Sequence, residues 1–129
     1  MDNKLVPEGS IEFHGAYFSP NATYLIAVEH DLKEKVDTLY VKFGPVSAQN
    51  DQLVREANDR VKKMVDSGQL AGGTLLKING PASLPLAVTI SHGVLHLYEA
   101  IAVYDPKISP PYVISVTHGL RYKVGDRIE

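Results

Sequence analysis

The sequence predicts a single α/β domain, in which two crossover helices connect a mixed sheet of about five to six strands in the order ββαβαββ. Two observations predict this class. Segments rich in β-forming residues alternate with two segments of helical period, and the run 100–103 is apolar at every position. Continuous apolar runs are typical of strands covered on both faces, as in parallel sheets. The 129 residues suffice for one domain with its own core, so residues 1–129 are predicted to fold as one unit.

The composition excludes several classes of function. There is no cysteine, which rules out thiolate zinc sites, iron–sulfur clusters and cysteine nucleophiles. Thirteen basic and fifteen acidic residues give a net charge of -2, which is unlike proteins that coat DNA or long RNA. The first residues lack a basic and apolar leader, and no apolar run approaches the roughly 20 residues of a membrane span. We therefore expect a cytoplasmic protein whose phosphate-bearing ligand, if it has one, is small.

The N-terminal third predicts an arm followed by a hairpin. Residues 1–21 mix glycine, proline and asparagine with scattered aromatic residues and have no sustained period, so we expect an arm or loop there. Residues 23–29 and 36–43 are rich in β-forming residues, and the second segment alternates apolar and polar positions. The charged stretch 30–35 is expected to turn between them, which makes the pair antiparallel.

Two helices are predicted in the middle of the chain. The clearest covers residues 50–67 and ends before Gly68; its apolar positions recur at helical spacing, at Leu53, Val54, Ala57, Val61, Met64 and Val65. After a short strand at 74–78, a second helix is predicted over residues 84–98, with Ser83 as its N-cap. This second helix is apolar over most of its circumference, which is typical of a helix that is buried or lies in an interface.

The turn Gly80-Pro81 between the third strand and the second helix has two interpretations. A glycine lets the backbone approach a phosphate closely, and the N-terminus of a helix favours an anion. The same dipeptide also forms plain tight turns, and from the dipeptide alone this is the stronger interpretation.

The chain is predicted to close with strands at 100–104 and 112–117, a turn at 105–111 between them, and an edge strand within 121–128. The two crossover units predict that the middle strands are parallel, and the hairpins add antiparallel neighbours.

The candidate site residues fall at opposite ends of one strand. His96 precedes the strand 100–104 and Asp105 follows it, so about 16 Å separates them. His118 is expected to return to the end of His96, while Lys107 stays with Asp105. A histidine and a carboxylate that share proton transfer must reach one substrate. Either these residues have separate duties, or the two ends meet between subunits of an assembly with two equivalent sites.

The motif of His96, eight intervening residues, Asp105-Pro106-Lys107 and then His118 resembles a known family. It is similar to the small CRISPR-associated ring nucleases of type III systems called the Csx-three family. The similarity covers roughly residues 75–128. It includes Gly80-Pro81, the strand AIAVYDP and a closing Val-Gly-Asp at 124–126.

The resemblance implies a small α/β protein that forms homodimers and cleaves cyclic tetra-adenylate, a second messenger of antiviral defence, with two dimers sandwiching the ring. It implies that His96 is catalytic, that Asp105 is catalytic or holds Mn²⁺, and that His118 matches the family's later histidine. Gly80, Pro81, Lys107 and His118 are expected to bind substrate. Larger relatives continue into an ATPase-like domain, which is a possible partner.

The chain departs from the family pattern at several points. Lys107 replaces an arginine, which keeps the charge but loses bidentate phosphate geometry. The loop after Lys107 is two residues longer, with Pro110-Pro111, and the arm before residue 23 is extra. His92 has no counterpart. It stands one helical turn from His96, and a lone histidine pair at that spacing is weak evidence for a metal site.

Three functions are compatible with these features. The first is a metal-assisted phosphodiesterase that opens a cyclic oligoadenylate. The second is a module that binds or senses the same ring without cleaving it. The third is an α/β assembly domain that binds no nucleotide.

Overall fold

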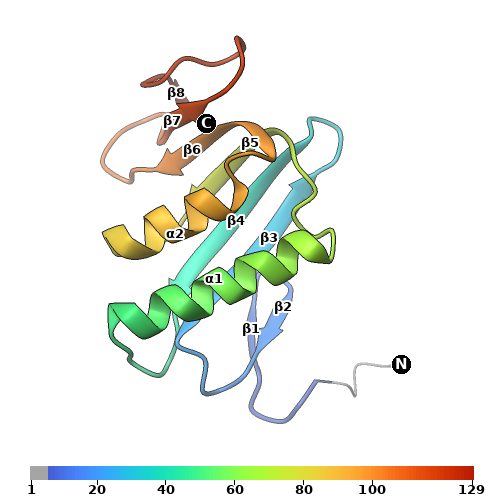
Figure 1. Cartoon of the computed structure of the whole chain (residues 1–129), viewed down its shortest axis with the longest axis vertical. Helices are drawn as coiled ribbons and strands as arrows, with labels where there is room; N and C mark the ends of the chain where they lie inside the picture. Colours follow the sequence, from blue (N-terminus) through green and yellow to red (C-terminus); the bar gives the residue numbers. More distant parts are fainter. Residues whose placement is uncertain (1–5) are drawn as a thin grey trace.

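A computed structural model describes residues 6–129 and confirms the predicted α/β class (Figure 1). A six-stranded mixed sheet has its strands in the order of the chain, β3-β4-β5-β6-β7-β8, and a separate two-stranded sheet pairs β1 with β2. The strands of the large sheet are β3 (Tyr24–Asp31), β4 (Val36–Phe43), β5 (Gly73–Asn79), β6 (Tyr98–Tyr104), β7 (Tyr112–Thr117) and β8 (Arg127–Ile128). The helices are α1 (Asn50–Asp66), between β4 and β5, and α2 (Leu84–Val94), between β5 and β6.

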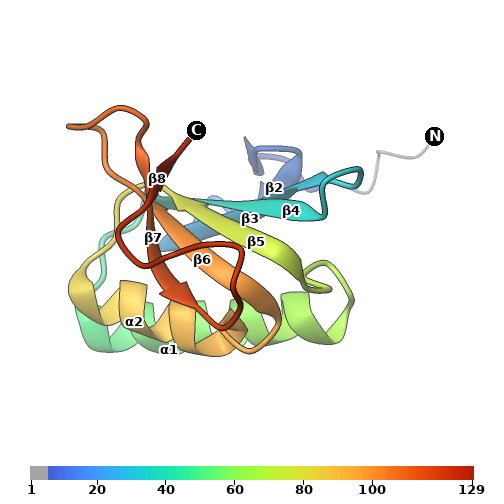
Figure 2. The same ribbon diagram turned by 90° about the horizontal axis from the view of Figure 1, so that it is seen from above.

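The three central strands are parallel, as predicted. β5 pairs parallel with both β4 and β6, whereas β3 and β7 run antiparallel to their neighbours. Both crossovers step in the same direction across the sheet, and connections of one hand then bring both helices to one face. Figure 2 shows α1 and α2 on that face, with no helix on the other, and Figure 1 shows that they lie side by side. We call the other side the open face.

The main core fills the space between the helices and the sheet. It contains side chains of both helices and of the sheet positions that face them, including Leu39, Leu53, Ala57, Val61, Met64, Leu76, Leu86, Ile90, Val94 and Ile101. A smaller buried cluster lies on the open face and contains Leu75, Ala100, Ala102, Tyr112 and Ile114. Ala100, Ile101 and Ala102 of β6 are therefore buried whichever face they occupy, which explains why the run is apolar without alternation, whereas Val103 at its end is 39% exposed.

Helix α1 follows its prediction within a residue, whereas α2 is four residues shorter than predicted. The Ser83 hydroxyl accepts a hydrogen bond from the Leu86 backbone N–H at 3.3 Å, so the predicted N-cap is confirmed. The helix ends at Val94, because Tyr98 already pairs with Gly73 at the start of β6. His96 therefore lies in the turn after α2 and not in its last helical turn.

The apolar surface of α2 is only partly covered within one copy. Leu86, Ile90 and Val94 are buried, but Leu84 is 82% and Val88 is 68% exposed. The expectation that this helix is buried or lies in an interface is thus met on one side of the helix. An interface on the other side remains a prediction.

Residues 1–21 were predicted as an arm or loop, and this is wrong for part of the segment. β1 (Ile11–Phe13) and β2 (Ala16–Phe18) form an antiparallel hairpin, whose turn residues His14 and Gly15 both have positive φ. Strands of three residues are too short for a period to be visible in the sequence. Residues 1–5 of the expected arm lie outside the described residues.

The last predicted strand is also shorter than expected. Of residues 121–128, only Arg127–Ile128 form a strand, while Gly125 and Asp126 before it share backbone hydrogen bonds with Ile114 of β7. Across the described residues 6–129, no helix is both long and apolar enough to cross a membrane.

Candidate functional site

Four of the predicted site residues lie at the edge where the central strands end, which we call the carboxyl edge. Ile78 of β5 is beside Val103 of β6, and Gly80 and Asp105 are each the first residue after the end of these two neighbouring strands. Pro81 follows Gly80, and Lys107 is held near Asp105 by its backbone N–H, which donates to Asp105 Oδ1 at 2.9 Å. Ligands of open α/β sheets collect at this edge.

The Asp105 carboxylate is oriented by its own loop. Besides the bond from Lys107, the Asp105 backbone N–H donates to the Pro111 carbonyl at 2.8 Å, which closes the loop between β6 and β7. Asp105 is half-buried, while the Lys107 side chain is exposed and free of ion pairs among the described residues. One carboxylate and one cation thus stand together at the carboxyl edge.

Gly80 and Pro81 have structural duties at this edge. Gly80 has φ of +133°, and a Cβ atom there would lie 1.9 Å from the Val41 carbonyl oxygen. The Pro81 carbonyl accepts a hydrogen bond from the Tyr24 hydroxyl at 2.6 Å. The plain tight turn therefore accounts for both residues, and a phosphate at this turn remains a prediction.

An open groove of about 730 Å³ lies between the N-termini of the two helices, near the ends of the central strands. The Ser83 hydroxyl donates to Asn50 Oδ1 at 2.8 Å across it. Helix N-termini favour anions, but Asp51 in the first turn of α1 opposes that preference. None of the predicted site residues lines this groove.

His96 and His118 lie together at the opposite edge, where the central strands begin. His118 Nε2 donates to the Leu95 carbonyl at 2.7 Å, beside His96 in sequence, and the His118 backbone N–H donates to the Glu99 carbonyl at 2.7 Å. Both imidazoles are exposed. The expected return of His118 to the end of His96 is confirmed, and its Nε2 contact leaves Nδ1 to face other groups.

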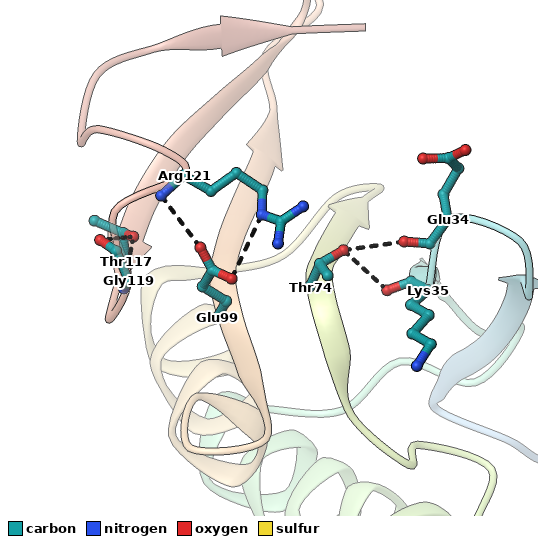
Figure 3. Close-up of polar contacts among 7 residues, drawn as sticks. All are labelled: Glu34, Lys35, Thr74, Glu99, Thr117, Gly119 and Arg121. Atoms are coloured by element: carbon teal, nitrogen blue, oxygen red, sulfur yellow. Dashed lines mark hydrogen bonds and ion pairs between the residues drawn. The ribbon is translucent and has the colours of Figure 1, made fainter.

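The turn that carries His118 is anchored on Glu99 (Figure 3). The Glu99 carboxylate accepts the Arg121 backbone N–H at 3.3 Å and lies 3.5 Å from the Arg121 Nε. Gly119 packs directly on it, because a Cβ there would lie 2.5 Å from Glu99 Oε2. These contacts with Glu99 fix the backbone around His118. On the neighbouring strand β5, the Thr74 hydroxyl donates a hydrogen bond to the Lys35 carbonyl at 3.2 Å.

The two groups of predicted site residues cannot act together within one copy. β6 has seven residues and lies between His96 and Asp105, which separates the ends of the strand by about 23 Å. A histidine that exchanges a proton must be within hydrogen-bond reach of its substrate, directly or through one water. The arrangement at opposite ends matches the sequence prediction, with a longer strand between them.

Within one copy, the described residues also offer too few donors for a metal centre. Among residues 6–129, no three His, Asp or Glu side chains are grouped so that they could hold an ion. Mn²⁺ prefers about six oxygen or nitrogen ligands, and Asp105 supplies one carboxylate. Residues 6–129 of one chain do not by themselves fit the expected Mn²⁺ site.

A buried polar network on the helix side of the sheet was not predicted from the sequence. Asp37, only 7% exposed, accepts from the Tyr98 hydroxyl at 2.5 Å and pairs with His30 Nδ1 at 2.7 Å. Burial, and then the Asp37 carboxylate, raise the pKa of Tyr98 above its ordinary value. The alternation of residues 36–43 placed Asp37 on the inner face of that strand, and a charged residue there was the available signal.

This network predicts loss of stability in alkali. Folded Tyr98 keeps its proton to higher pH than an unfolded tyrosine, so above about pH 10 the native state binds more protons and the free energy of unfolding falls. Tyr98→Phe should show a shallower fall between about pH 9 and 11 in urea unfolding, and exposed Tyr17→Phe an unchanged one. Equal slopes in all three proteins would contradict the assignment.

Comparison with known proteins identifies no relative: the chain matches no protein-family model, and no curated protein is significantly similar to it.

Proposed function

We propose that the chain is a ring nuclease that binds and cleaves cyclic tetra-adenylate, and that it acts in the cytoplasm to end type III CRISPR antiviral signalling. The observation that carries the proposal is the placement of His96 and His118 at one end of β6 and of Asp105 and Lys107 at the other. Side chains at opposite ends of β6 can act on one substrate only when the two ends are brought together by different copies of the chain. A cyclic ligand held between copies meets that requirement.

In the proposed assembly, the edge with the two histidines faces the carboxyl edge of a neighbouring copy. The chain forms homodimers, and two dimers sandwich the ring. Twofold symmetry then produces two equivalent sites. An ATPase-like protein, which is fused to the larger members of the family that the chain resembles, is the proposed macromolecular partner.

The proposed reaction is an internal transesterification. His96 takes the proton of a ribose 2′-hydroxyl, O2′ forms a bond to the adjacent phosphorus, and the bond from phosphorus to O5′ breaks. The departing O5′ takes a proton from the imidazolium form of His118, through Nδ1, because Nε2 is bonded to the Leu95 carbonyl. The products are linear, with a 2′,3′-cyclic phosphate at one end and a 5′-hydroxyl at the other. Positioning and charge stabilisation provide the acceleration.

The remaining site residues act on the phosphate. The Lys107 ammonium offsets the charge on the phosphate oxygens, and Asp105 orients the neighbouring groups. Asp105 is also the carboxylate that would bind Mn²⁺, with its other ligands from the substrate, water or a second copy. The ion would supply further positive charge beside the phosphate.

The test is to incubate pure protein with cyclic tetra-adenylate and Mn²⁺ and to resolve the products by chromatography. We expect conversion to linear products with 2′,3′-cyclic phosphate ends, and a loss of about a hundredfold or more in His96→Ala. His92→Ala is the matched control, since His92 is an exposed histidine on α2 with no assigned role. Recovery of intact ring after long incubation with excess protein would reject the nuclease.

The competing function is a module that binds the same ring without cleaving it. The observation in its favour is that the described residues of one copy lack a complete metal or proton-transfer site. Intact ring together with a calorimetric binding signal would support this alternative. A complete absence of heat and of thermal shift would leave an assembly domain.

A further inference from the structure

A row of polar and aromatic side chains crosses the open face of the sheet just below the carboxyl edge. Tyr40 of β4 is beside Asn79 of β5, and Tyr104 of β6 is beside Tyr112 of β7. Ile78 pairs with Val103, so Asn79 and Tyr104 are neighbours one residue further along. Four adjacent strands therefore present Tyr, Asn, Tyr and Tyr at one level, which we call the tyrosine row.

Contacts within the row hold its members in place. The Asn79 side-chain amide donates to the Tyr112 hydroxyl at 2.8 Å, and the Tyr104 and Tyr112 rings meet edge to face at 5.3 Å. Lys77 Nζ lies 5.0 Å from the centre of the Tyr112 ring. Tyr112 is only 8% exposed, whereas Tyr104 is 37% exposed. Tyr112 thus supports the row, and Tyr104 offers a ring to the solvent.

The two ends of the open face are occupied, and its middle is not covered by a helix (Figure 2). On one side the hairpin of β1 and β2 places the His14 ring against Tyr40, parallel and 3.8 Å away. On the other side Tyr122 and Ile128 pack on the small cluster of this face. Between them lie Tyr104, which directly precedes Asp105, and, on the neighbouring strand β5, Asn79 and Lys77, of which Lys77 is level with Ala102.

The tyrosine row and Lys77 together offer the kinds of side chain that bind a nucleobase and its phosphate. Single-stranded RNA is bound by sheets on which bases stack against aromatic rings, and each such stack contributes to affinity whatever the base. An asparagine amide matches N6 and N7 of adenine, and Asn79 keeps one N–H and its oxygen after bonding Tyr112. The next open-face positions before the row on β4, β5, β6 and β7 are Thr38, Lys77, Ala102 and Ile114. Among these and the row itself, Lys77 is the one charged side chain.

We propose that the tyrosine row is an adenine-binding platform: one base of an oligoadenylate stacks on Tyr104, Asn79 hydrogen-bonds its edge, and Lys77 faces the adjoining phosphate. This inference rests on the proposed function and extends it, because it assigns residues that select adenine beside the aspartate of the carboxyl edge. The base would lie on the copy that contributes Asp105 to the shared site.

The platform is tested with a probe that needs no cleavage, a linear tetra-adenylate carrying a 5′-fluorescein, by fluorescence anisotropy. Tyr104→Ala should raise the Kd about tenfold, and Tyr104→Phe, which keeps the ring, should change it less than about threefold. Tyr17→Ala is the matched control, because Tyr17 is an exposed tyrosine of β2 outside the row. Thermal unfolding of each variant checks that the fold is retained.

Two further variants test the other assignments. Asn79→Ala should reduce the preference for tetra-adenylate over tetra-uridylate by about fivefold or more. Lys77→Gln should weaken binding of both oligonucleotides. It should also reduce the slope of log Kd against log salt concentration by about one.

The outcomes separate the platform from the nuclease. If wild-type protein leaves the ring intact but binds linear tetra-adenylate through Tyr104, the nuclease is wrong and the platform stands. If it cleaves the ring while Tyr104→Ala binds the probe as tightly as wild type, the platform is wrong and the nuclease stands. Equal weakening in Tyr104→Ala and Tyr104→Phe would assign the effect to the hydroxyl and also overturn stacking.

Discussion

An equimolar mixture of His96→Ala and Asp105→Ala chains is expected to recover roughly a quarter of wild-type ring cleavage, although each variant alone loses about a hundredfold or more. A site shared between copies needs His96 from one chain and Asp105 from another. Random pairing of the two variants produces that combination at about one site in four. The assay is the chromatographic separation of ring from linear products, with subunit exchange verified by copurification of differently tagged chains.

The control for this rescue is a mixture of His96→Ala with His118→Ala. Both histidines lie at the same edge, held together by the contact of His118 with the Leu95 carbonyl. A shared site would draw both from one chain, and neither variant has both. We therefore expect no rescue in this mixture. Equal activity in the two mixtures, or no activity in either after verified exchange, would refute a site built from the two ends of β6 in different copies.

Gly80→Ala should lower the free energy of unfolding by about 3 kcal/mol. The new methyl would lie 1.9 Å from the Val41 carbonyl oxygen and 2.9 Å from the Val41 side chain, in a backbone with φ of +133°. The neighbour is the backbone of a central strand, which cannot move aside without breaking its pairing. Urea unfolding monitored by circular dichroism measures the loss.

Gly125→Ala separates the steric clash from backbone strain. Gly125 also has positive φ, of +95°, but a methyl group there would meet no atom within 4 Å apart from those of its chain neighbours. We expect it to cost only about 1 kcal/mol. If the two variants lose the same stability, the contact with Val41 is not what requires a glycine at position 80. Ring binding by the folded fraction of Gly80→Ala then tests the predicted role in substrate binding separately.

Local patterns predicted most of the fold. The alternation of residues 36–43 matches β4 to the residue, and the apolar stripe over 50–67 matches α1 within one residue. These elements are long, so each shows several repeats of its period. The end of α2 was missed because the apolar residues that follow Val94 suit a helix as well as a strand, and pairing of Tyr98 with Gly73 decides between them.

Some features of the candidate site could likewise be predicted from one segment, and others could not. The positions of His96 and Asp105 follow from counting residues along one strand, and this holds whatever packs around it. The network of Asp37 with Tyr98 joins residues 61 positions apart, and the tyrosine row joins four strands. Such groupings depend on strand order and register, which no single segment contains.

The sequence by itself determined the two helices and the strands of the large sheet to within a few residues, and that the candidate histidines and the aspartate stand at opposite ends of one strand. Both follow from periods and lengths within a segment, because side-chain direction and rise per residue are local properties of the backbone. Only the tertiary structure decided that both helices cover one face, that Asp37 is buried against Tyr98, and that an open face presents the tyrosine row. These depend on the pairing of strands distant in the chain, where packing and hydrogen bonding across segments outweigh local preference.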